Sequence, residues 1–155
     1  MIPDHNADAF KSDFHVESNN WLLDFLIAGF RRWDAIHFTF IAKNGYVNEF
    51  SAAFFPLYPF SVHYFSEYVL KSLIQLLQLP LDDNTFLLGG LILNFIYFTL
   101  AQIYLFKLTK LLLLNQTVAF VSCILFSFNP ASIFFTAPYS ESLYSALTFS
   151  GLYYL

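Results

Sequence analysis

Charge and cysteine are what this sequence has least of. Only 12% of its 155 residues are Asp, Glu, Lys or Arg, whereas an average globular domain has about 25%. A single cysteine, Cys123, excludes a disulfide framework within the chain. Five glycines and six prolines exclude collagen-like and low-complexity classes. Seven basic residues and a net charge of −4 leave no basic patch for nucleic acid.

Apolar and aromatic residues take the place of the missing charges. Hydrophobic residues make up 57% of the chain and aromatic residues 21%, with 21 phenylalanines. A soluble domain of this size would leave a large apolar surface exposed to water if it carried so many rings. We therefore predict an all-α, multi-pass transmembrane protein, because helices satisfy their own backbone groups in lipid.

Uncharged runs predict where the chain crosses the membrane. Residues 84–106 and 111–140 contain no charged side chain, and about 20 apolar residues suffice to span the hydrocarbon core. We expect spans at 86–106 and 117–135. A further apolar stretch, 141–155, stops without a polar flank, so we expect a truncated span and a fragment of a longer protein.

Residues 56–79 allow two interpretations. The segment is long enough to span, but His63, Glu67 and Lys71 form one polar stripe at i, i+4 and i+8. The stripe could face other helices in the bilayer or headgroups at its surface. The apolar character of the other faces slightly favours a span. A run Gly89–Gly90 within the next span indicates a helix-packing site.

The first 55 residues are more polar. Residues 1–20 form a polar N-terminal segment, and residues 21–55 hold two amphipathic helical patterns, at 21–30 and 33–41. Both patterns are too short to span, so we expect helices at the water–lipid interface of a lumenal loop. Lys107 and Lys110 follow the span at 86–106, and the positive-inside rule places them in the cytosol. A span at 56–79 that started in the lumen would predict the reverse.

The densest cluster of charged residues surrounds Asp34. Asp34 could act as a general base at the membrane surface, or it could simply stabilise the first turn of a helix. Arg32 could bind a lipid phosphate, or be an ordinary basic flank. His37 could hydrogen-bond Asp34 or the phosphate, or be a surface histidine.

Further acids offer candidates for substrate binding. Glu49 could bind a sugar, or be a solvated loop carboxylate. Glu141 is an isolated acid near a membrane face, which points to a function, although helix N-termini also favour acids. Tyr139 lies beside it in a Pro-bounded turn. The sequence contains no Cys/His cluster with metal-ligand spacing, and we expect no metal site.

Several short motifs together resemble the GPI mannosyltransferase 2 family, also called the phosphatidylinositol-glycan class V family. In chain order they are Trp33-Asp34-Ala35, His37-Phe38, Ile41-Ala42, Gly45-Tyr46, Phe54-Phe55-Pro56, Asn129-Pro130-Ala131-Ser132 and Tyr139-Ser140-Glu141. Their order and spacing extend over nearly the whole chain.

The resemblance implies a multi-pass enzyme of the endoplasmic reticulum membrane with a GT-C-type fold, of which this chain would be a part. Such an enzyme transfers mannose from dolichol-phosphate mannose to the growing GPI glycolipid, forming the alpha-1,6 link of the second mannose, and needs no cofactor. Asp34 matches the essential acid of the first lumenal loop. It would deprotonate the acceptor hydroxyl for an inverting displacement. On chemical grounds, Arg32 or His37 could stabilise the leaving phosphate.

Two alternatives remain open at this point. A non-catalytic membrane subunit or pseudoenzyme of the same fold would keep the helices without the chemistry, and a small membrane partner subunit could accompany either form. A transporter fragment would need His63, Glu67, Lys71 and Glu141 to face one cavity.

Overall fold

Helices form all the regular structure that is described. The computed structural model describes Phe30 and residues 33–47, 49–78 and 84–155. Within these residues no strand occurs, so the all-α prediction is confirmed for them. The polar segment 1–20, the first amphipathic pattern and Arg32 lie outside the described residues.

The longest helix is α5, Thr85–Leu113, which extends the predicted span at both ends. Its 29 residues correspond to about 43 Å at 1.5 Å per residue, more than the ~30 Å hydrocarbon core. By length and composition it is the one described helix able to cross a membrane alone. Lys110 lies in its last turn, and Leu114 ends it in the left-handed conformation (φ 50°).

The return from α5 is a bent helix pair. Helix α6, Gln116–Ser127, begins where the Asn115 side chain accepts hydrogen bonds from the backbone N–H groups of Thr117 and Val118. Pro130 then starts the short helix η4, Pro130–Ser132, followed by α7, Ile133–Thr136. The two parts bend by 64°, so the expected span at 117–135 is a broken span or a re-entrant loop.

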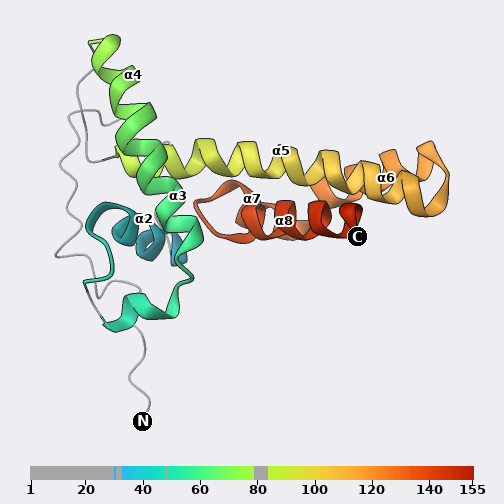
Figure 1. Cartoon of the computed structure of the whole chain (residues 1–155), viewed down its shortest axis with the longest axis horizontal. Helices are drawn as coiled ribbons and strands as arrows, with labels where there is room; N and C mark the ends of the chain where they lie inside the picture. Colours follow the sequence, from blue (N-terminus) through green and yellow to red (C-terminus); the bar gives the residue numbers. More distant parts are fainter. Residues whose placement is uncertain (1–29, 31–32, 48, 79–83) are drawn as a thin grey trace.

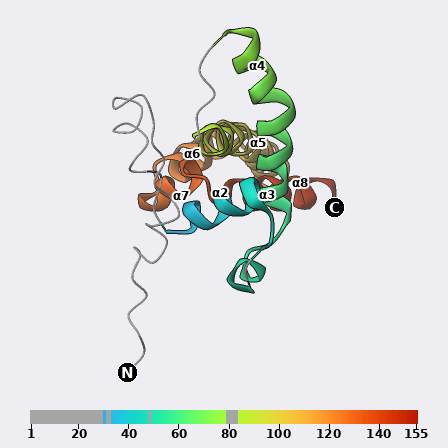
Figure 2. The same ribbon diagram turned by 90° about the vertical axis from the view of Figure 1, so that its left-hand side faces the viewer.

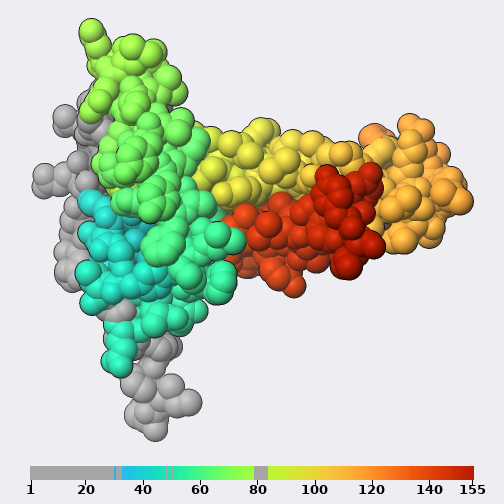
Figure 3. Space-filling view, viewed as in Figure 1, coloured from blue at the N-terminus to red at the C-terminus, as the bar shows by residue number. Residues whose placement is uncertain are grey.

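Helix α8, Glu141–Tyr154, runs back beside α5 (Figure 1). Together α5 to α8 form an elongated bundle (Figure 3). Membrane crossing by α8 stays a prediction.

A second group of helices lies across the Thr85 end of this bundle. It consists of α2, Asp34–Asn44; η2, Glu49–Ala53; α3, Leu57–Tyr64; the π-helical turn η3, Phe65–Leu70; and α4, Lys71–Leu76. The last three continue as one rod that crosses α5 rather than running alongside it (Figure 1). Figure 2 looks along α5 and shows α2 lying across its end as well.

This arrangement bears on the two interpretations of residues 56–79. If α5 crosses the bilayer along its own axis, a rod lying across its end runs along the membrane surface. The arrangement therefore favours the interfacial alternative over the span that the sequence slightly favoured.

Two adjacent glycines allow the bundle and the crossing rod to meet. A Cβ on Gly89 would overlap the fully buried Ser66 of η3, and one on Gly90 would lie 2.8 Å from Cβ of Pro138. The prediction that Gly89–Gly90 is a helix-packing site is confirmed.

Candidate functional site

The site begins at the abrupt start of α2. Trp33 precedes the helix with φ 56°, a left-handed conformation that is unfavourable for a bulky residue. Asp34 is therefore the first helical residue, and its side chain is exposed. The positive end of the helix dipole stabilises an ionised carboxylate at this position.

The second part of the site is the turn between α7 and α8. The fully buried Asn94 of α5 donates hydrogen bonds through Nδ2 to the carbonyls of Ala137 and Tyr139, the latter at 3.1 Å. From the other side, Ser142 Oγ donates to the Phe135 carbonyl at 2.7 Å. The turn is thus held by α5 and by the start of α8.

Small side chains bring the turn against α2. Ala35, Ala137 and Tyr139 form one buried cluster, against which Phe30 and Phe134 pack. Ala35 is fully buried although Asp34 beside it is exposed. The acidic start of α2 therefore lies next to Tyr139.

Electrostatic interactions link three of the candidate residues, Asp34, Tyr139 and Glu141. Burial raises the pKa of the Tyr139 phenol, and the negative charges of Asp34 and Glu141 raise it further. The carboxylates of Asp34 and Glu141 also repel each other. The structure thus brings Asp34, Tyr139 and Glu141 together from distant parts of the sequence.

Glu141 is the more enclosed of the two acids. It is half-buried in the first turn of α8, and its Oε2 is buried without a hydrogen-bond partner among the described residues. The negative charge of Glu141 also interacts electrostatically with the buried Tyr58 of α3. A buried carboxylate oxygen without a donor is a strong acceptor for an incoming hydroxyl group.

Two other candidates, His37 and Glu49, lie on α2 and η2. The His37 ring stacks on Phe54, with centroids 4.8 Å apart. Glu49 is exposed in η2, and none of the described interactions joins it to Asp34. Arg32 lies outside the described residues. Searching the described residues finds no group of three or more His, Cys, Asp or Glu that could hold a metal ion.

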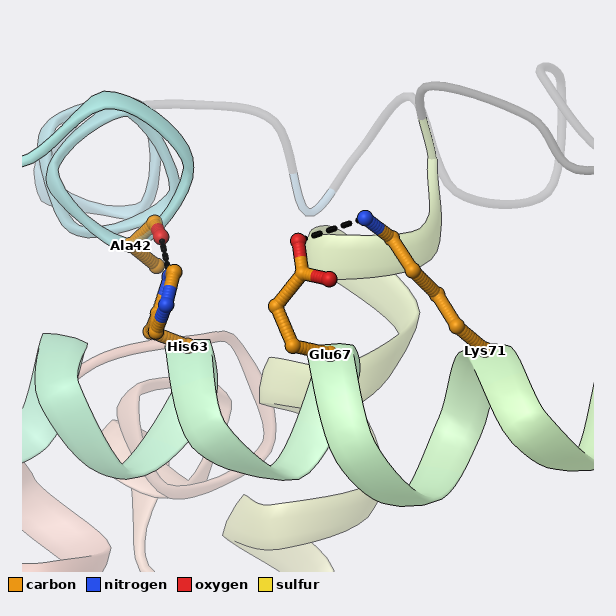
Figure 4. Close-up of polar contacts among 4 residues, drawn as sticks. All are labelled: Ala42, His63, Glu67 and Lys71. Carbon is orange, nitrogen blue, oxygen red and sulfur yellow. Dashed lines mark hydrogen bonds and ion pairs between the residues drawn. The ribbon is translucent and has the colours of Figure 1, made fainter.

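The polar stripe of the α3–α4 rod has local partners (Figure 4). His63 Nδ1 lies 2.6 Å from the Ala42 carbonyl near the end of α2, and carries the proton because a carbonyl only accepts. Glu67 and Lys71 form an ion pair of 2.5 Å, and Lys71 Nζ lies 5.2 Å from the Phe86 ring centre. Glu141 instead neighbours Asp34, so the described residues do not assemble the polar path that a transporter would need.

Sequence analysis missed Asn94 altogether. The available signal was an amide side chain within an uncharged run, where burial demands hydrogen-bond partners. Those partners are backbone carbonyls of the turn, which no side-chain motif reveals.

Known proteins of one family match this chain along nearly its whole length. The family model described as Mannosyltransferase (PIG-V) matches residues 1–155. The chain is 39% identical over 155 residues to GPI alpha-1,6-mannosyltransferase 2 of Cricetulus griseus and 38% over 154 residues to that of Homo sapiens. Each match covers 98% of this chain and 30% of the relative.

A more distant relative gives the same result. GPI mannosyltransferase 2 of Drosophila melanogaster is 34% identical over 148 residues, which cover 93% of this chain and 32% of the relative. The chain spans about a third of the length of these curated relatives. No solved structure matches the chain significantly. Since the family model covers every residue, the chain belongs to the PIG-V mannosyltransferase family.

Proposed function

We propose that this chain carries the acceptor-activating site of a GPI mannosyltransferase, with Asp34 as the general base. The relatives are named GPI mannosyltransferases, which are glycosyltransferases, and the mammalian ones are named for the alpha-1,6 linkage. The observation that carries the proposal is the packing of Ala35, beside exposed Asp34, against Ala137 and Tyr139 of the turn that leads to Glu141.

The proposed reaction is a single inverting displacement. A hydroxyl oxygen of the GPI precursor bonds to the anomeric carbon of dolichol-phosphate mannose as the bond to the phosphate oxygen breaks. Asp34 takes the hydroxyl proton, and dolichyl phosphate leaves without needing a general acid. The product carries the second mannose in alpha-1,6 linkage.

Tyr139 and Glu141 suit the acceptor sugar. Two carboxylates that repel each other are stabilised by hydrogen-bond donors, and sugar hydroxyls supply them. Glu141 Oε2 has no partner among the described residues and would accept one such bond. Glu49 would contact a more distant part of the glycan, and Arg32 and His37 would stabilise the leaving phosphate.

Orientation in the membrane supports a lumenal site. Helix α2, which begins at Asp34, lies at the Thr85 end of α5 (Figure 1), whereas Lys110 lies in the last turn at the opposite end. The positive-inside rule places the lysine end in the cytosol. If residues 56–79 lie along the surface, they add no membrane crossing before α5, although Lys43 and Lys71 lie at the Thr85 end. We therefore propose a multi-pass enzyme of the endoplasmic reticulum membrane whose Asp34 faces the lumen.

The test is rescue of cells that lack this mannosyltransferase by the natural gene product carrying Asp34→Asn. We expect loss of GPI-anchored proteins from the cell surface and accumulation of the precursor with one mannose. Glu67→Gln, which changes an acid in the α3–α4 rod, serves as the control and should rescue normally. Normal rescue by Asp34→Asn would remove Asp34 from the mechanism. Purified protein that binds the lipid donor but transfers no mannose would favour the pseudoenzyme alternative.

A further inference from the structure

Asn94 is a fully buried polar residue within the long apolar helix α5. An amide in such surroundings is costly unless it is hydrogen-bonded. Its Nδ2 donates to two carbonyls of the α7–α8 turn, those of Ala137 and Tyr139, whereas its Oδ1 has no partner among the described residues. One side chain therefore ties the bundle helix to the backbone of the turn.

A second contact fixes the turn from the same helix. Pro138 packs against Gly90, one helical turn before Asn94, so closely that a Cβ there would lie 2.8 Å from Pro138 Cβ. Gly90 and Asn94 thus hold three consecutive residues of the turn, 137–139. We call this pair the α5 clamp.

The clamped turn carries the residues that meet Asp34. Tyr139 packs in one cluster with Ala35, and Glu141 follows two residues later at the start of α8. A displacement of the turn would move both groups relative to Asp34. We propose that Asn94 is a positioning residue, which holds Tyr139 and Glu141 against Asp34 and does not itself touch the substrate; this inference rests on the proposed function.

A purely structural role would have a different signature. Gln102 offers the matched comparison, because it is another polar residue of α5 whose Nε2 donates to Ser127 Oγ of α6 at 2.6 Å. Its Oε1 is also buried without a partner among the described residues. It lies about 12 Å farther along the helix, at 1.5 Å per residue. If α5 polar bonds matter only for folding, loss of either should have similar effects.

The kinetic experiment compares Asn94→Leu with Gln102→Leu in the purified natural gene product. A displacement of about 1 Å at a reacting centre can lower a rate by about 10²-fold. We expect Asn94→Leu to lower kcat by about that factor with little change in the donor KM, and Gln102→Leu to change kcat less than about threefold. Adding Asn94→Leu to Glu141→Gln should lower kcat by less than the product of the two single effects, since the contribution of a positioned Glu141 is already lost. Equal losses for the two leucine variants, or a fully multiplicative double variant, would overturn the inference.

A second pair of variants avoids removing the amide. Gly90→Ala pushes Pro138 while Asn94 is intact, whereas Gly151→Ala in α8 adds a methyl group where nothing lies within 4 Å. We expect Gly90→Ala to reproduce the loss in kcat and Gly151→Ala to leave it unchanged. Wild-type kcat in Gly90→Ala would contradict the clamp, even if Asn94→Leu fails to accumulate.

A geometric readout separates this inference from the proposed function. Cysteines placed by Ala35→Cys and Ala137→Cys, in a Cys123→Ser background, should cross-link in the buried cluster, and Asn94→Leu should reduce that cross-linking. If the wild type transfers no mannose, the proposed function fails but this readout still applies. Undiminished cross-linking in Asn94→Leu would then overturn the positioning role by itself.

Discussion

Replacing Gly89 with alanine should destabilise the junction between α5 and the α3–α4 rod. The added Cβ would overlap Ser66 Oγ and lie 3.3 Å from Ser66 Cβ. Ser66 is fully buried in the π-helical turn, so it cannot swing into open space. Overpacking of this kind costs about 1–3 kcal/mol, and the better helix propensity of alanine returns up to about 1 kcal/mol. Because the overlap falls on a fully buried side chain, we expect the upper half of that cost, about 2–3 kcal/mol, and a net loss of about 1–2 kcal/mol.

The clash can be relieved from the other side. Ser66 Oγ has no hydrogen-bond partner among the described residues, so Ser66→Ala removes no hydrogen bond to them. In the double variant only the 3.3 Å approach of the two Cβ atoms remains. We therefore expect Ser66→Ala to restore most of the stability that Gly89→Ala removes, a non-additive pair.

Thermal unfolding of the purified protein in detergent measures both effects. The midpoint should fall for Gly89→Ala and recover in the double variant. It should stay level or rise for Gly151→Ala, whose methyl group meets nothing and whose helix propensity is better. A midpoint unchanged by Gly89→Ala, or a double variant less stable than Gly89→Ala alone, would refute the packing argument.

Two further predictions concern topology and a helix cap. Glu49→Asn creates an Asn-Phe-Ser sequon on an exposed element that the proposed orientation places in the lumen, so the protein should gain a glycan removable by an endoglycosidase. The natural sequon Asn115-Gln116-Thr117, at the lysine end of α5, should stay unmodified; the opposite pattern would invert the proposed orientation. Asn115→Ala removes the cap that accepts two backbone N–H groups and should cost about 1 kcal/mol of unfolding free energy. Asn115→Asp keeps an accepting oxygen and should cost little, and equal losses in a denaturation series would argue against capping.

Features set by local chemistry were predictable from the sequence. The uncharged run at 84–106 indicated α5, because length and hydrophobicity alone decide whether a helix can span. Gly89–Gly90 indicated that another element packs closely against this helix, since glycine is the one residue without a Cβ. Asp34 stood out in the densest cluster of charged residues, and Glu141 stood out as an isolated acid near a membrane face.

Features set by long-range packing were not predictable. Asp34 and Glu141 could each be singled out, but their meeting depends on the return of the chain along α5 and on the small side chains of Ala35 and Ala137. Hydropathy could not decide whether residues 56–79 span or lie flat, because both states need an apolar face. The uncharged run at 111–140 predicted a span at 117–135 but not the 64° bend within it.

The most direct test of the account is mannosyl transfer by the purified natural gene product with and without Asp34→Asn. The variant keeps the size of the side chain and removes its ability to take a proton. General-base catalysis contributes about 10²–10⁴-fold to a rate, so we predict that kcat falls by that factor while binding of dolichol-phosphate mannose is retained. An Asp34→Asn enzyme with wild-type kcat would contradict the account.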